Sequence, residues 1–244
     1  MTRYVENFDL PSKGLLYTPE DNIPATVGLR PMTTKEEKML FGSPSNKVLN
    51  EVIAECLDQK FDLSKLLLPD QFFLMIMLRV VSYGSDYTVK AECPSCGKTH
   101  EYTVDLSDLH IYELDEDFEE PFELTLPKSK DVLSVRLLRG KDIEDVDKET
   151  RRFERRFKES KGDMSYIYRM MKYITEVNGE LISGGKLQGY VENMVGMDSA
   201  YLADKVNSVE LGIDTLILED CKGCGEELEF DLPMTPEFFR PKFR

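Results

Sequence analysis

The segments Cys93-Pro-Ser-Cys96-Gly97 and Cys221-Lys-Gly-Cys224-Gly225 decide the fold of this 244-residue chain. Each is a Cys-x-x-Cys followed by Gly, and each lies between two β-rich runs. This order predicts a strand, a tight turn and a return strand at both places. Two such turns supply four thiolates, the number that a closed tetrahedral zinc site needs. We therefore expect one structural zinc per chain, held by Cys93, Cys96, Cys221 and Cys224.

Turn geometry and ligand chemistry favour zinc over the alternatives. The Gly after each second Cys permits the positive φ that such a turn needs. Two unrelated turns or redox-active thiols stay open, and an iron–sulfur cluster can also use four Cys ligands, although ribbon-like hairpins favour zinc. Four Cys fill the coordination shell, so we expect no metal catalysis. For His100, four residues past Cys96, we expect a position on a strand surface rather than ligation.

Composition and charge narrow the class of protein. With 41% hydrophobic and 32% charged residues, the chain is typical of a soluble globular protein of one or two domains. No apolar stretch is long enough for a membrane span, and the N-terminus lacks the apolar core of a signal peptide. We therefore expect a reducing cytosol, where paired cysteines bind metal more often than they form disulfides. The formal charge of −15 disfavours nucleic acid as a partner, because phosphate binding rests on Lys and Arg.

The two Cys pairs also predict how the chain is divided. We expect an α+β fold, mostly helical, with a split four-Cys zinc ribbon and an inserted β-hairpin. The C-terminal part carries three Phe residues that either dock on a partner or fold back on the core. The expected parts are an N-terminal extended segment and helical core at 1–85, the split ribbon at 86–106 plus 214–233, an inserted hairpin and helical region at 107–213, and a C-terminal docking tail at 234–244.

Two long helices are expected before the first Cys pair. Apolar residues at helical spacing predict a helix that starts at Asn46 and buries Cys56 as a small core residue. A second, almost uniformly apolar helix opens at Pro69-Asp70, and Asp70 is the expected N-cap. It ends at Tyr83-Gly84, where Gly is a suitable C-cap.

The inserted region begins with an acidic stretch at 113–123, which we expect to be a solvated linker. Alternation at 122–126 and 133–138 predicts a β-hairpin. The remaining expectations are helices at 142–158 and 164–177, with Asn178-Gly179 ending the latter, a flexible turn at Gly184-Gly185, and a helix capped by Asp198 or Ser199 that reaches about Leu211.

The one concentrated basic patch lies on the helix at 142–158 and comprises Arg151, Arg152, Arg155, Arg156 and Lys158. Nearby Glu residues make an exposed, balanced helix face the simpler interpretation. The alternative is an electrostatic contact with an acidic partner protein. With two histidines and no phosphate-binding glycine loop, the sequence gives no positive evidence for an enzyme.

Four motifs resemble one known family when taken together. They are Leu10-Pro-Ser-Lys-Gly-Leu-Leu-Tyr17, Leu29-Arg-Pro-Met-Thr-Thr-Lys-Glu-Glu37, Leu66-Leu-Leu-Pro-Asp70, and Leu78-Arg-Val-Val-Ser-Tyr-Gly-Ser-Asp-Tyr87 leading into the first Cys pair. The set is similar to the baseplate hub subunit and hub-assembly proteins of contractile-tailed, T-even-type bacteriophages. The resemblance is clearest over residues 10–106 and looser over the second Cys pair.

This resemblance implies a non-enzymatic structural or assembly protein of the baseplate hub. Its implied partners are other phage baseplate and tail proteins, including the hub and the tape measure. Its implied location is the virion tail baseplate, or the host cytoplasm during assembly. Two alternatives stay open: a zinc-ribbon regulator that binds nucleic acid through the basic patch, and a zinc-containing tail assembly chaperone absent from the virion.

Overall fold

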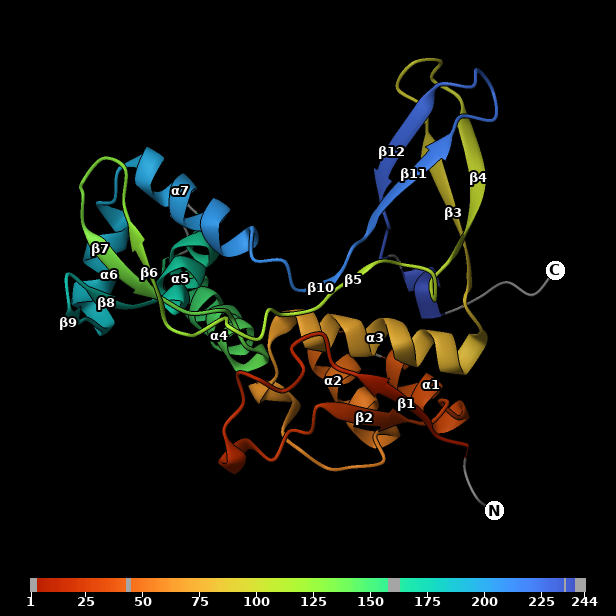
Figure 1. Ribbon diagram of the computed structural model, residues 1–244, viewed down its shortest axis with the longest axis horizontal. Coiled ribbons are helices and arrows are strands. Elements are labelled where there is room, and N and C mark those ends of the chain that lie inside the picture. The colour runs from red at the N-terminus through yellow and green to blue at the C-terminus, as the bar shows by residue number, and fades with distance from the viewer. Residues whose placement is uncertain (1–3, 43–44, 158–162, 235, 240–244) are drawn as a thin grey trace.

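The computed structural model of the protein describes residues 4–42, 45–157, 163–234 and 236–239. It has three visible parts (Figure 1): a base (residues 4–83), an upright arm (86–105 and 216–231) and a lateral lobe (122–207). The fold is mixed helix and sheet, with seven α-helices and a helical fraction of 41% among the described residues. The predicted mixture of helix and sheet is confirmed, whereas the expectation of a mostly helical chain is not.

The α-helices divide between the base and the lobe. They are α1 (Thr34–Gly42), α2 (Asn46–Cys56) and α3 (Leu68–Tyr83) in the base, and α4 (Gly140–Arg156), α5 (Met164–Tyr173), α6 (Gly184–Glu192) and α7 (Gly196–Asn207) in the lobe or beside it.

The strands form small antiparallel sheets. They are β1 (Glu6–Asp9) with β2 (Thr26–Leu29), β3 (Asp86–Glu92) with β4 (Thr99–Asp105), β5 (Ile111–Tyr112) with β10 (Gly212–Ile213), β11 (Leu216–Asp220) with β12 (Glu227–Asp231), and a four-stranded sheet of β6 (Phe122–Thr125), β7 (Val132–Val135), β8 (Ile174–Val177) and β9 (Glu180–Leu181).

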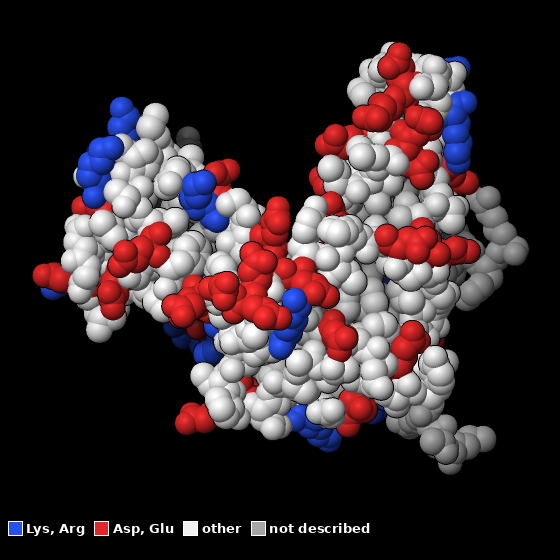
Figure 2. All heavy atoms as spheres, in the orientation of Figure 1, with Lys and Arg blue, Asp and Glu red and all other residues white. Residues whose placement is uncertain are grey.

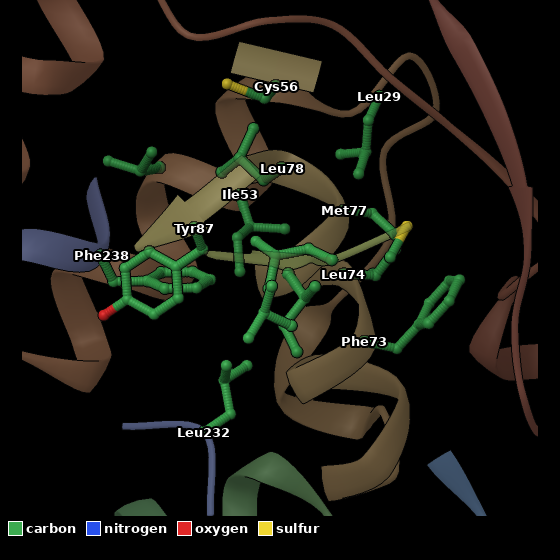
Figure 3. Close-up of a cluster of buried hydrophobic side chains, with 14 of the residues drawn as sticks. Leu29, Ile53, Cys56, Phe73, Leu74, Met77, Leu78, Tyr87, Leu232 and Phe238 are labelled. Carbon is green, nitrogen blue, oxygen red and sulfur yellow. The ribbon is translucent and has the colours of Figure 1, made fainter. Parts of the chain in front are cut away.

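The base and the arm share one hydrophobic core. Helix α3 lies at its centre, and its apolar side chains face α2, the β1–β2 pair and the lower ends of the arm strands (Figure 3). As predicted, α2 starts at Asn46 and Cys56 is fully buried. Helix α3 also ends as predicted, because Gly84 has φ +88° and its N–H donates to the Val80 carbonyl.

The C-terminal segment folds back onto this core. Phe238 is 2% exposed, and its ring packs edge to face on Tyr87, with ring centroids 5.1 Å apart. Of the two sequence alternatives for this segment, the fold-back is the one observed at Phe238. The end of the expected docking tail, residues 240–244, lies outside the described residues.

The lobe has its own hydrophobic core, and its sheet is larger than the sequence predicts. The expected hairpin is present as β6–β7, but β8 and β9 extend it to four strands. The predicted helix at 164–177 is wrong in its last four residues, because Ile174–Val177 forms β8 and pairs with β7. Asn178 and Gly179 have φ values of +52° and +78°, so they form a hairpin turn into β9 rather than a helix end.

Three further expectations need correction. The flexible turn expected at Gly184-Gly185 is the start of helix α6. Asp70 is not an N-cap, because α3 begins at Leu68 and Asp70 is buried in its first turn. Asp198 is not a cap either: it is 1% exposed, and its carboxylate accepts hydrogen bonds from the N–H groups of Lys128 and Ser129. Both carboxylates accept hydrogen bonds from a segment distant in the sequence, instead of from N–H groups at the start of their own helix.

The acidic stretch is only partly the expected solvated linker. The Glu120 side chain is 7% exposed and pairs with Arg139 at 2.7 Å, and its carboxylate also accepts from the Leu137 N–H. Glu120 therefore attaches the segment that connects arm and lobe to residues 137–139, which lie just before helix α4. Among the described residues, no helix has the length and apolar character that crossing a membrane requires.

Candidate metal centre

The four predicted cysteines meet at the tip of the arm. All four Sγ atoms lie within 4.8 Å of one another. The Sγ–Sγ distances are 3.8 Å for Cys93 and Cys224 and 3.7 Å for Cys96 and Cys221. A disulfide has a sulfur separation of about 2.0 Å, whereas a tetrahedral site with zinc–sulfur bonds of about 2.3 Å separates its sulfurs by about 3.8 Å. The spacing therefore fits four ligands around one ion.

The two turns that carry these sulfurs are built alike. In the first, the Cys93 N–H donates to the Lys98 carbonyl at 3.0 Å and the Gly97 N–H donates to the Cys93 carbonyl at 2.8 Å. In the second, Cys221 and Gly225 make the equivalent bonds, both 2.8 Å long. Gly97 and Gly225 have φ values of +67° and +76°. The sequence expectation that Gly supplies a positive φ is confirmed at both turns.

The strands below the turns explain why the sulfurs converge. The β3–β4 hairpin presents Cys93 and Cys96, the β11–β12 hairpin presents the other pair, and the two hairpins stand side by side in the arm (Figure 1). Tyr102 and Phe230 make a ring contact between the hairpins, with centroids 5.8 Å apart. Lys222 donates to the Glu101 carbonyl and lies over the Tyr102 ring. These contacts join the hairpins independently of any metal.

The electrostatics of the cluster favour a cation. The pKa of the Cys221 thiol is lowered to about 6, first because the Gly223 N–H donates to its Sγ at 3.4 Å. For Cys224 the Glu226 N–H lowers the pKa, but the neighbouring sulfurs outweigh it, so the pKa is raised. Thiolates packed this closely repel one another, and a divalent cation removes that repulsion. The donor set is soft sulfur alone, which suits zinc or iron.

The remaining candidate residues lie away from the cluster. Cys56 is buried in the base, on α2. His100 belongs to β4 and its Nε2 is buried beside Gly223, without a hydrogen-bond partner among the described residues; it is less exposed than the expected strand-surface position. Four of the five basic-patch residues, Arg151, Arg152, Arg155 and Arg156, are exposed on α4, and Lys158 lies outside the described residues.

One comparison with known proteins is decisive. The family model described as T4 bacteriophage base plate protein matches residues 1–240. The chain belongs to this family. Neither the curated proteins nor the solved structures gave a match. The match extends through both Cys pairs, so the four-cysteine cluster lies inside the matched region.

Two motifs of the baseplate protein meet at a buried carboxylate that sequence reasoning missed. Asp70, from the Leu66–Asp70 motif, accepts from the Ser12 N–H at 3.0 Å and from the Tyr17 hydroxyl. The Tyr17 oxygen in turn accepts from the Leu67 N–H at 3.0 Å. The Pro-Ser-Lys-Gly turn is thus fastened to the first turn of α3. The sequence held a signal, since a Tyr and an acidic residue occur in two of the family motifs, but these two residues are 53 positions apart in the chain.

A third motif of the baseplate protein supplies a buried cation. Arg79 is 1% exposed, and its guanidinium donates to three backbone carbonyls, those of Phe238, Gly84 and Asp86. Burial lowers its pKa. Because its acceptors come from the end of α3, the start of β3 and the C-terminal segment, Arg79 fixes the place where the arm and the C-terminal segment meet the base. In the sequence, the signal for this buried cation was an Arg within the apolar run that forms α3.

Proposed function

We propose that this protein is a non-enzymatic structural or assembly component of the phage baseplate hub, stabilised by one structural zinc. The family match over residues 1–240 carries the proposal. The hub is favoured because the motifs Leu10–Tyr17, Leu66–Asp70 and Leu78–Tyr87 resemble those of hub proteins. In the structure all three motifs meet at helix α3 and its ends. Zinc is favoured over an iron–sulfur cluster because two hairpins with Cys-x-x-Cys-Gly turns form a compact single-ion site.

In this proposal the metal acts as a clasp. Cys93, Cys96, Cys221 and Cys224 fill a tetrahedral shell and leave no open position for a substrate. The ion fastens two segments of the chain whose nearest cysteines, Cys96 and Cys221, are 125 positions apart. The proposed parts are residues 1–85, the split ribbon at 86–106 plus 214–233, the inserted region at 107–213, and residues 234–244. The functional surfaces then lie elsewhere on the protein, and the zinc site fixes their relative positions.

The proposed partners are other tail proteins, including the hub and the tape measure, and the proposed location is the tail baseplate. Quantitative mass spectrometry of purified virions and of hub intermediates from infected cells tests this. A component of the hub is found in both at a fixed ratio to the other hub proteins. An assembly chaperone is found in the intermediates and is absent from the virion. Absence from both, with no tail protein co-purifying, contradicts the proposal.

A further inference from the structure

We propose that the groove between β4 and β11 is a docking site for an extended, basic segment of another protein, which adds as a strand to the open edge of β11. The groove has a volume of 290 Å³ and is lined by residues 103–105 of β4, 216–219 of β11, and the loop residues Asp108, Leu109, His110 and Asp214. It lies at the lower end of the arm, away from the sulfur cluster. The inference rests on this groove and not on the hub or zinc proposal.

The first argument is that β11 has an open edge. Among the described residues, β11 pairs with β12 alone. The Leu232 N–H donates to the Thr215 carbonyl and the Cys221 N–H donates to the Glu226 carbonyl, both at 2.8 Å. Hydrogen-bonded and non-bonded positions alternate in an antiparallel ladder. Residues 215, 217, 219 and 221 therefore bond to β12, and the N–H and C=O of Leu218 point to the opposite edge.

The second argument is that β4 forms the other wall with an open edge of its own. The Leu106 N–H donates to the Ser85 carbonyl and the Cys93 N–H to the Lys98 carbonyl, so even-numbered residues of β4 bond to β3. The peptide groups of Thr103 consequently point away from β3. Higher on the same edge, the Glu101 carbonyl is taken by Lys222. The second hairpin thus covers the upper part of this edge, and the groove opens where that cover ends.

The third argument identifies the occupant by its charge. The groove is lined by four carboxylates, Asp105, Asp108, Asp214 and Glu219, and by no Lys or Arg. Asp and Glu side chains also gather along the arm on the face seen in Figure 2. The whole chain carries a formal charge of −15, so a second copy brings like charge to the groove. An extended segment with Lys or Arg side chains is complementary to it.

The alternation of β11 sets the pattern of that segment. Leu216 and Leu218 are 42% and 61% exposed on one face of the strand, and Glu219 lies on the other face. Side chains on neighbouring strands pair on the same face. A strand added to β11 therefore places aliphatic side chains beside Leu218 and basic side chains beside Glu219. The recognition mode is strand addition, in which main-chain hydrogen bonds supply affinity and alternate side chains supply specificity.

The test uses the full chain and three peptides as long as β11. One alternates valine with lysine, one alternates valine with glutamate, and one is the lysine peptide with alternate peptide nitrogens methylated. Binding is followed by fluorescence anisotropy and by amide chemical shifts. The lysine peptide is expected to bind saturably and to shift the Leu218 and Thr103 amides. The glutamate peptide should bind at least about tenfold more weakly, and methylation should abolish binding, because it removes the strand's donors.

A backbone variant separates strand addition from charge attraction. Leu218→Pro removes an N–H that does not bond to β12, and proline is tolerated at such outward-facing edge positions. It should keep the far-ultraviolet circular dichroism spectrum and lose the lysine peptide, whereas Leu218→Thr should keep both. Equal binding of the lysine and glutamate peptides, binding unaffected by methylation, shifts confined to other parts of the chain, or no binding of the lysine peptide each overturns the proposal. The methylated peptide decides the question on the unmodified protein if the proline variant does not fold.

Discussion

The Tyr17 hydroxyl donates a hydrogen bond to the buried carboxylate of Asp70 and accepts one from the Leu67 N–H. Burial raises the pKa of both the phenol and the carboxylic acid. One side chain thus satisfies a donor at the start of α3 and an acceptor inside it. The turn at residues 10–17 is therefore held by polar contacts that water cannot replace.

Replacing Tyr17 with Phe should destabilise the protein by about 1–3 kcal/mol, because it leaves a buried donor and a buried acceptor each without one partner. Urea unfolding followed by circular dichroism measures this. The matched control is Tyr4→Phe, since Tyr4 is 68% exposed and its hydroxyl bonds to the surface residue Glu6. Equal unfolding midpoints for Tyr17→Phe and the wild type contradict the prediction.

Metal analysis of the purified protein should find about one zinc per chain. Cys93→Ser or Cys221→Ser should each weaken zinc binding and lower the melting temperature, because metal binding is coupled to folding. Cys56→Ala is the control: this cysteine is buried in the base, far along the chain from the cluster. It should leave the zinc content unchanged even where it lowers stability. If removing the metal leaves the melting temperature of the wild-type protein unchanged, the structural role of zinc is ruled out.

Stability should fall with acid through the Arg30–Glu36 pair. The Glu36 side chain is 2% exposed and lies 3.0 Å from Arg30. Burial on its own raises the pKa of Glu36, but hydrogen bonds from Arg30 and Thr33 outweigh it and lower the pKa from 4.5 to about 2. A lowered folded-state pKa stabilises the fold above the unfolded value, and this contribution is lost as the pH falls from about 4.5 to about 2.

The measurement compares the free energy of unfolding of wild type and Glu36→Gln at several pH values. The variant should be about 3 kcal/mol less stable at neutral pH, because it leaves Arg30 buried without its counter-charge. The difference should shrink towards pH 2. Glu51→Gln is the control, since the ion pair that Glu51 makes with Lys47 is exposed to solvent. A difference that does not change with pH argues against the pair.

Replacing Phe238 with Ala should cost about 3–5 kcal/mol, as for other buried aromatic residues. The ring contacts Tyr87, and the Phe238 carbonyl accepts from Arg79. The control is Phe157→Ala, because Phe157 is 49% exposed at the end of α4; it should change stability by about 0.5 kcal/mol or less. Thermal melts of the two variants are the measurement, and similar losses in both indicate that the C-terminal segment does not contribute to the core.

Local rules in the sequence were enough for the parts of the fold that depend on neighbouring residues. The Cys-x-x-Cys-Gly turns, the start of α2 at Asn46 and the end of α3 at Gly84 all follow from side-chain spacing or from the freedom of glycine at positive φ. The convergence of the four cysteines also followed, because two identical turns between strands suggest one shared site.

The misplaced elements depend on contacts between distant segments. Ile174–Val177 continues the helical pattern of α5, but it pairs with β7, which lies far back in the chain. The Asn178-Gly179 dipeptide was a usable hairpin signal and was taken for a helix end instead. Asp70 and Asp198 have the side chain of an N-cap, yet their hydrogen-bond donors come from residues 58 and 70 positions away. Residue type and spacing do not contain such pairings.

The shared core of base and arm has a consequence for the order of folding during synthesis. Ile217, Leu228, Leu232 and Phe238 belong to the same buried cluster as Leu10, Val27 and Leu74, whereas the lobe core, apart from Leu67, draws on residues 126–206. A chain emerging from the ribosome can therefore assemble the lobe before the base is complete. The base completes its core only after residues 217–238 have been translated, so it closes after the lobe although it is made earlier.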